Sequence, residues 1–471
     1  MDFQEKQLIE PHVVLIPSAG MGHLNPFSRL AASLADLCKV SMVSISPTVS
    51  SAESNHLSNM FSAYPQIHPI HFKMPCYDLS DYPDADPFFL RWEMISRCAS
   101  DIINHIRTNC PVPVTALVVD IAVAEKFVHL SKSLDIPCYI LYTTTAAMLS
   151  FSAYFPTYCD SKTTVCLGDV EIPGLRTVSM ASIPRMLHDP KNLFTQPFIE
   201  NGRMLLKVDG IFVNTFESFE RDTLAVLRDG RAQPDFPPTI TVGPLMPLKM
   251  PIAGTAKVFP WLDKQPVNSV VYVNFGNCTG MSKDQIRELG LGLETSGCRF
   301  LWVIKTTVVD SQDVAELDDL LGEGFFERIK ERGMVVKGWV DQNAVLGSNS
   351  VGGFVSHSGG NSVMEAAMHG VRMLAWPMLG DQRINAVPVV ESGLGMWVEN
   401  WSWQGEDKIV SGKEIGEKVK EMMANEALLA TACLVGEEAR RAAAPGGTSY
   451  KGLVEFVENI KKHIKVRPAS W

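Results

Sequence analysis

The chain has 471 residues, more than a single hydrophobic core usually serves, so we expect two domains. The composition, 46% hydrophobic and 20% charged, is ordinary for a globular protein, and the net charge of −10 argues against nucleic-acid binding, which needs a basic surface. No apolar run approaches the ~18 residues of a membrane span, and the N-terminal MDFQEKQLIE lacks the apolar core of a signal peptide. The ten cysteines have no paired spacing, which favours reduced thiols in the cytoplasm, and we expect a monomer.

The first half of the sequence alternates short apolar runs with helical patterns. The predicted elements are strands at 13–17, 40–46, 116–120 and 139–143 and helices at 26–37 and 88–106. This alternation is lost near 242–257, where Pro and Gly recur and the apolar residues follow neither helical nor strand spacing, and it resumes afterwards. In the second half the predicted elements are strands at 269–275, 300–305, 334–340, 351–355 and 373–378 and helices at 283–294 and 362–369.

Apolar strands separated by helices indicate parallel sheets covered on both faces. We therefore predict an α/β fold of two Rossmann-like, doubly wound parallel-sheet domains that face a cleft. The predicted parts are a first domain at 1–242, a linker at 243–258, a second domain at 259–447, and a C-terminal helix at 448–471 that packs back on the first domain. Ligands of such sheets bind beyond the carboxyl ends of the strands, so we expect the substrates in the cleft.

The stretch FVSHSGGNSVMEA, residues 354–366, joins a strand to a helix through small and polar residues. The first N–H groups of a helix lack partners within the helix and carry its partial positive charge, so they can bind a phosphate. His357, Asn361 and Ser362 can add hydrogen-bond donors, and the glycines permit a tight turn. From this segment alone, an ordinary capped turn is an equal alternative.

The surroundings of this stretch favour the phosphate site. Residues 339–382 open with W-x-x-Q, hold H-x-G-x-N-S with a glutamate three residues later, and close with D-Q. This segment closely resembles the signature box of plant secondary-product UDP-glycosyltransferases, which have the GT-B fold. Further stretches that are similar to this family are AGMGHLNP near the start, VNTFESFE at 213–220 and YVNFGN at 272–277.

The resemblance implies a role for each matching residue. Trp339 would stack on uracil, the Val340 backbone would read the base edge, and Gln342 and Glu365 would bond the ribose hydroxyls. The implied diphosphate contacts are His357, Asn361 and Ser362, and Gly359 and Gly360 are further residues of the UDP-sugar site. The implied sugar contacts are Thr143, Asp381 and Gln382, with Asn277 as a further donor-site residue. A terminal glutamine in this box suggests UDP-glucose as donor.

The sequence departs from the family at a few positions. Ser358 stands where Cys is usual and Arg372 where Pro is usual, and we expect both to be tolerated. Gly360 replaces a Trp that lies beside the donor sugar, so we expect a lost apolar contact and an open space there. Pro388 falls inside the helix that follows the box and removes one of its hydrogen bonds.

His23, in SAGMGHLNP, follows the first strand and precedes a helix. A lone histidine there more often caps the helix or is satisfied in the core, but the resemblance implies that it is the catalytic base. Asp120 ends the strand ALVVD and matches the aspartate that orients this histidine and stabilises its charged form. The rival interpretation, a dinucleotide fingerprint at Gly20-x-Gly22, lacks its third glycine and the acidic residue after the second strand.

Two stretches look like metal sites. In HPIH, at 68–71, histidines three apart on a strand point to opposite faces, and DAD, at 84–86, reads as a solvated loop. We therefore predict no metal and no other cofactor.

Four stretches resemble the flavonoid C-glycosyltransferase subgroup: DPFF at 86–89, SAGMGHL, FFLRWE and GDQRINA. In DPFF and the helix after it, Asp86, Phe88, Phe89 and Trp92 would line the acceptor pocket, although core packing of that helix is equally compatible. The resemblance implies an inverting transfer of glucose from UDP-glucose to a plant phenolic, a flavonoid or dihydrochalcone, with formation of a C-glycoside. The alternatives are an O-glucosyltransferase and a catalytically impaired UDP-sugar-binding protein.

Overall fold

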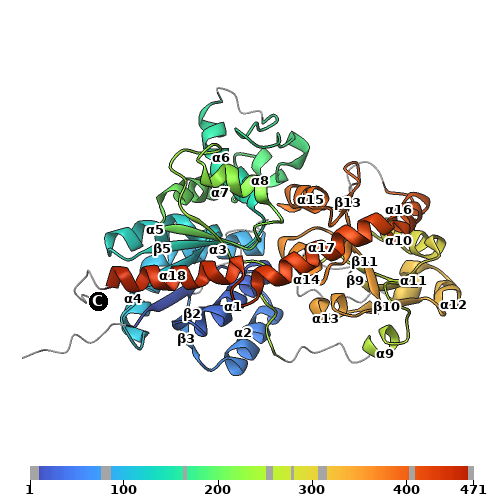
Figure 1. Ribbon diagram of the computed structural model, residues 1–471, viewed down its shortest axis with the longest axis horizontal. Helices are drawn as coiled ribbons and strands as arrows, with labels where there is room; N and C mark the ends of the chain where they lie inside the picture. The colour runs from blue at the N-terminus through green and yellow to red at the C-terminus, as the bar shows by residue number, and fades with distance from the viewer. Residues whose placement is uncertain are drawn as a thin grey trace, which may run out of the picture.

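The computed structural model describes residues 10–75, 86–162, 167–250, 258–276, 280–305, 316–401 and 409–464. They form two parallel sheets side by side, each with helices packed against it (Figure 1). The first sheet has the order β3-β2-β1-β4-β5-β6-β7 and the second β10-β9-β8-β11-β12-β13. These two α/β halves confirm the predicted fold class.

The elements of the first half cover the described residues up to 241. Its strands are β1 (His12–Ile16), β2 (Lys39–Ser46), β3 (Ile67–Lys73), β4 (Ala116–Asp120), β5 (Cys138–Tyr142), β6 (Gly210–Val213) and β7 (Thr239–Thr241). Its helices are α1 (Met21–Ala35), α2 (Ser51–Ala63), α3 (Pro87–Arg97), α4 (Ala99–Asn109), α5 (Ala124–Ser133), α6 (Ala146–Asp160), α7 (Thr195–Met204) and α8 (Arg221–Arg228).

The second half follows the same alternation. Its strands are β8 (Val270–Asn274), β9 (Arg299–Ile304), β10 (Gly333–Lys337), β11 (Val351–Ser356), β12 (Arg372–Ala375) and β13 (Gly395–Trp397). The helices from 258 onward are α9 (Phe259–Leu262), α10 (Lys283–Ser296), α11 (Leu317–Leu321), α12 (Phe325–Ile329), α13 (Gln342–Leu346), α14 (Gly360–His369), α15 (Gln382–Glu391), α16 (Gly412–Ala424), α17 (Glu426–Ala443) and α18 (Thr448–Ile464).

The central strands are apolar on both faces because both faces are buried. Along β1, Val14 and Ile16 join one core, and Val13 and Leu15 join the core on the other side of the sheet. Both sheets reverse their strand order at one place, between β1 and β4 and between β8 and β11. Loops that leave neighbouring strands in opposite directions open a crevice at such a switch point, and ligands bind there.

Three predicted elements have different bounds in the structure. The helix predicted at 88–106 is two helices, α3 and α4, with Cys98 between them. The buried stripe continues through that break, so the apolar spacing cannot reveal it. The strand predicted at 334–340 ends at Lys337 because Gly338 has a φ of +97°. The strand predicted at 373–378 is Arg372–Ala375 and ends before the Trp376–Pro377 pair.

Each half contributes apolar side chains to a hydrophobic core of the other half. Ile384 of α15 belongs to the core of the first half, whereas Phe216 and Phe219, which follow β6, belong to a core of the second half. After α17, the chain returns to the first half as α18, which lies along the first sheet (Figure 1). There the Ser449 hydroxyl donates a hydrogen bond to the Gly243 carbonyl.

Candidate functional site

The residue predicted as the base, His23, lies in the first turn of α1, because this helix starts at Met21 and not after the histidine. The turn requires Gly20, the N-cap, whose φ is +100°. Asp120 ends the neighbouring strand β4 and is fully buried. His23 Nδ1 lies 2.9 Å from Asp120 Oδ2 and 3.1 Å from Oδ1. Since a carboxylate only accepts, Nδ1 carries the proton and Nε2 has the free lone pair.

Two backbone N–H groups fix the Asp120 carboxylate. Ala122 N donates to Oδ1 at 2.9 Å, and Ser18 N approaches Oδ2 at 3.4 Å. Burial favours the neutral form of His23, but the charge and hydrogen bond of Asp120 outweigh it, so the pKa of His23 is raised above its usual value. This pair can hold a proton taken from a substrate.

An aromatic cluster lies beside the pair. Trp92 of α3 meets the His23 ring edge-on, with ring centroids 5.1 Å apart, and its Nε1 donates to the Ala19 carbonyl at 3.0 Å. Phe89 stacks on Phe194, which precedes α7, at a centroid distance of 4.6 Å. Phe194 is a residue that the sequence analysis missed, since it lies far from the DPFF stretch along the chain.

The other two predicted acceptor residues lie at the start of α3. Asp86 is its N-cap, and its Oδ1 accepts from the N–H groups of Phe88 and Phe89 at 2.8 and 3.2 Å. The Phe88 ring packs over Gly20, where a Cβ atom would lie 3.4 Å from it. Asp86 therefore has a local task, the orientation of the helix that carries Phe88, Phe89 and Trp92.

Across from His23 lies the N-terminus of α14. The N-cap is Gly359, which makes no side-chain cap, so the first N–H groups of the helix have no capping side chain. His357, just before it, lies between two glycines: a Cβ at Gly276 would be 3.0 Å from its ring, and a Cβ at Gly359 only 2.6 Å from Nε2. Burial lowers the pKa of His357 to about 4, so the ring is neutral at pH 7.

Two buried polar atoms near this terminus have no partner among the described residues, Ser358 Oγ and Asn361 Oδ1. Ser358 is fully buried and has a φ of +66°, in the left-handed region that favours glycine. Asn361 Nδ2 donates to the Gly22 carbonyl of α1 at 3.2 Å. Unpaired buried polar atoms are rare, and a bound ligand is one way to satisfy them.

The expectation of an open space at Gly360 is wrong for this arrangement of the chain. A Cβ atom there would lie 2.7 Å from Thr144 Oγ1 and 2.9 Å from Thr144 Cα. Thr144, in the loop after β5, fills the volume that a side chain would need. The glycine permits close contact between the two halves.

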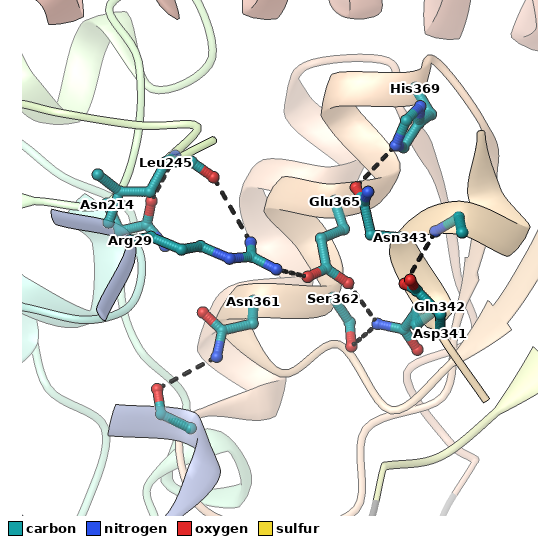
Figure 2. A network of polar contacts seen from close by, with 12 residues as sticks. Arg29, Asn214, Leu245, Asp341, Gln342, Asn343, Asn361, Ser362, Glu365 and His369 are labelled. Atoms are coloured by element: carbon teal, nitrogen blue, oxygen red, sulfur yellow. Dashed lines mark hydrogen bonds and ion pairs between the residues drawn. The ribbon is translucent and has the colours of Figure 1, made fainter. Parts of the chain in front are cut away.

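The predicted ribose residues form one network (Figure 2). Gln342 Nε2 donates to Glu365 Oε2 at 2.9 Å and to Ser362 Oγ at 3.0 Å, and Gln342 Oε1 accepts from Asn274 at 3.0 Å. Glu365 Oε1 accepts from Arg29 Nη2, which comes from α1 in the other half. Arg29 and Asn274 were not predicted as site residues.

The predicted base-binding residues follow β10. Trp339 is half exposed, at 50%, whereas Val340 is buried in the core of the second half. Asp341 caps α13 by accepting from Ala344 N at 3.0 Å. The exposed indole is therefore held on an anchored backbone, as a stacking platform requires.

The predicted hexose residues start α15. Gln382 Oε1 accepts from Met378 N and Leu379 N at 2.8 and 3.0 Å, so only its Nε2 remains for a sugar hydroxyl. Asp381 Oδ2 accepts from Asn385 Nδ2 at 2.7 Å.

Thr143, the other residue predicted to contact the sugar, lies in the loop after β5. Thr143 is buried, and the hydroxyls of Thr144 and Thr145 donate to Asn385 Oδ1 at 2.9 and 2.7 Å. Asn385, another residue that the sequence analysis missed, thus joins α15 to the first half. Asn277 lies outside the described residues.

The other two departures from the family pattern, Arg372 and Pro388, lie in a strand and a helix of the second half. Arg372 is buried and donates to the carbonyls of Gly352 at 2.8 Å and Met423 at 3.0 Å, so it fixes the end of α16. Pro388 stays inside α15, which continues to Glu391.

No group of three His, Cys, Asp or Glu side chains within the described ranges could hold a metal ion. His68 and His71 make separate hydrogen bonds to α4. The His68 ring bonds the Asn109 carbonyl, and the His71 carbonyl accepts from the His105 ring. Asp84 lies outside the described residues. No helix in the part of the chain that the structure describes has the length and hydropathy of a membrane span.

Residues 252–425 match the family model "UDP-glucoronosyl and UDP-glucosyl transferase". The chain is 50% identical over 451 residues to UDP-glycosyltransferase CGT of Oryza sativa subsp. japonica, with 95% of each chain covered. It is 34% identical over 394 residues to isoflavone 7-O-glucosyltransferase 1 of Glycine max, with 81% of this chain and 82% of the relative covered. The crystal structure of LpCGTa in complex with UDP matches with a TM-score of 0.85 and 45% identity, covering 96% of this chain and 99% of that one.

Proposed function

Because the chain belongs to the UDP-glycosyltransferase family and has its GT-B fold, we propose that it transfers glucose from UDP-glucose to a carbon atom of a plant phenolic, with inversion. The observation that carries this proposal is the position of the His23–Asp120 pair. It faces the N-terminus of α14, and Asn361 of that terminus bonds the Gly22 carbonyl beside His23.

His23 Nε2 takes the proton of a phenolic hydroxyl, and Asp120 stabilises the resulting imidazolium. The phenolate charge spreads onto the ring, which makes the ortho carbon nucleophilic. That carbon attacks the anomeric carbon of glucose from the side opposite UDP. A C–C bond forms and the bond from the anomeric carbon to the diphosphate oxygen breaks. Loss of the ring proton to solvent restores aromaticity, and the His23 imidazolium returns its proton to the phenolate oxygen. The products are the C-glucoside, UDP and one proton.

The departing diphosphate gains negative charge, which the free N–H groups of α14 and the donors His357 and Ser362 stabilise. These donors are neutral, so we propose that the reaction needs no metal. Activity should persist in EDTA. Loss of activity that Mn²⁺ or Mg²⁺ restores would contradict this part of the proposal.

O-glucosylation is the second candidate, because a relative is named as an isoflavone 7-O-glucosyltransferase. The two reactions share the base and the leaving group and differ in which acceptor atom faces the anomeric carbon. A UDP-sugar-binding protein without activity is the third, and the intact His23–Asp120 pair argues against it.

The deciding experiment is incubation with UDP-glucose and a dihydrochalcone or flavonoid, followed by acid treatment of the product. C-glucosides survive acid hydrolysis and O-glucosides do not. We expect an acid-resistant product whose mass exceeds that of the acceptor by one hexose residue. An acid-labile product would select O-glucosylation, and no product with any phenolic would contradict the proposed activity. We further propose that the protein is a monomer and acts in the cytoplasm.

A further inference from the structure

Arg29 is a buried charge that the proposed reaction does not yet use. It lies two turns after His23 on α1, is only 8% exposed, and reaches into the second half of the molecule (Figure 2). Its Nη2 bonds Glu365 Oε1, and its Nη1 approaches the Leu245 carbonyl at 3.5 Å. The Glu365 side chain is 7% exposed, so both charges are out of water.

A buried ion pair is weak evidence for stability, because removing both charges from water offsets most of their attraction. Its geometry matters more. The pair joins residues 336 positions apart and connects α1 directly to α14. A second bridge, Asn361 to Gly22, joins the same two helices one turn earlier on α14.

The two oxygens of Glu365 are bonded from opposite sides. Arg29 holds Oε1 and Gln342 holds Oε2, so the plane of the carboxylate is fixed. A carboxylate has about four acceptor positions, and these two bonds leave positions for further donors. Arg29 can therefore orient the group without occupying the positions that hydroxyls need.

We propose that Arg29 is a positioning residue for the nucleotide: it orients Glu365 so that the carboxylate accepts hydrogen bonds from the ribose hydroxyls. This inference rests on the proposed donor site and extends it to a residue of the acceptor half. Because His23 and Arg29 are on one helix, the helix that holds the base also aligns the donor nucleotide.

The test compares UDP with 2′,3′-dideoxy-UDP, which lacks both ribose hydroxyls, by calorimetric titration of the full chain. The wild-type chain should prefer UDP. Arg29→Met should weaken UDP about tenfold, the usual effect of one charge-assisted hydrogen bond, and leave dideoxy-UDP affinity unchanged. Glu365→Gln should behave alike, and the double variant should lose no further preference. Arg29→Lys should restore part of it, since the charge remains but the planar fork is lost.

Arg203→Met is the matched control, because it makes the same side-chain change at a partly exposed ion pair of the first half, Arg203 with Asp160, outside the Glu365 network. It should keep the wild-type preference for UDP. Arg29→Gln, a polar and uncharged variant, gives the same reading if Arg29→Met does not fold.

Three results would overturn the inference: an unchanged preference in Arg29→Met and Arg29→Gln, an equal weakening of both nucleotides, or tighter UDP binding, which would mean that Arg29 competes with ribose. If the wild-type chain binds both nucleotides equally, the ribose site itself is wrong. This result differs from a failure of the Arg29 role alone, in which the wild-type chain still prefers UDP.

Discussion

The proposed acceptor side and the proposed donor side differ in their chemistry. On the proposed acceptor side, the hydrogen-bonded pair His23–Asp120 lies beside stacked aromatic rings. On the donor side, the N-terminus of α14 offers neutral donors, with glycines where a side chain would disturb them. A base needs a shifted pKa, whereas a diphosphate needs fixed donors and close backbone approach. The difference predicts that substitutions on each side affect different steps.

The largest effect is expected for His23→Ala. Loss of a general base typically lowers the rate by ~10²–10⁴. Steady-state kcat and calorimetric UDP affinity should separate, with kcat reduced and UDP affinity unchanged. Near-normal turnover with any phenolic acceptor would contradict the base assignment.

The second prediction concerns pH. His23 must be neutral to accept a proton, and its raised pKa means that it stays protonated to a higher pH than a free histidine, whose pKa is about 6.5. The rate should therefore fall as the pH drops, with the acid limb of kcat/KM above that value. Asp120→Asn removes the charge that raises the pKa, so the limb should move to lower pH and the rate should decrease. If the acid limb of kcat/KM stays at the same pH in Asp120→Asn, it reports the titration of another group.

The third prediction tests the contact between the two sides. Gly360→Trp should weaken UDP-glucose binding, because the indole must displace Thr144; overpacking of this kind typically costs about 1–3 kcal/mol. Thr144→Gly in the same chain should recover part of the affinity. Calorimetry with UDP-glucose measures both variants. Tighter binding by Gly360→Trp alone would restore the interpretation that Gly360 marks a lost sugar contact.

The smallest effect is expected in the aromatic cluster. Phe89→Ala and Phe194→Ala each remove one ring of a stacked pair, worth about 0.5–1.5 kcal/mol beyond the buried area. The KM for the phenolic acceptor should rise several-fold while the KM for UDP-glucose stays constant. An equal rise for both substrates would indicate a structural effect instead.

The local structure of the segment 339–382 was largely predictable, because most of the donor-site candidates are neighbours in the sequence. The helix start near 360 follows from the glycines and polar residues after the strand. The fold class was predictable for a similar reason: strands such as β1 and β4 are apolar on both faces and leave a plain signal.

Contacts between distant segments could not be predicted. Arg29 has no local signal, since its partner is 336 residues away, and Phe194 is brought to Phe89 only by the packing of α7. The same holds for Gly360. The sequence suggested an empty space beside it, but Thr144, which belongs to the other half, fills that space. The roles of the predicted site residues in binding remain predictions.

The return of the chain as α18 has a mechanical consequence. Met250 packs against a core of the first half and Val258 belongs to a core of the second, and the chain is back on the first half in α18. The Ser449–Gly243 hydrogen bond joins the start of α18 to the segment that precedes Met250. We expect the segments around Ser449 and Gly243, which lie next to both crossings of the chain, to act as a hinge between the halves. We expect the cleft to open for substrates by rotation about that point, so that displacements are smallest near Gly243 and grow toward the far end of each half.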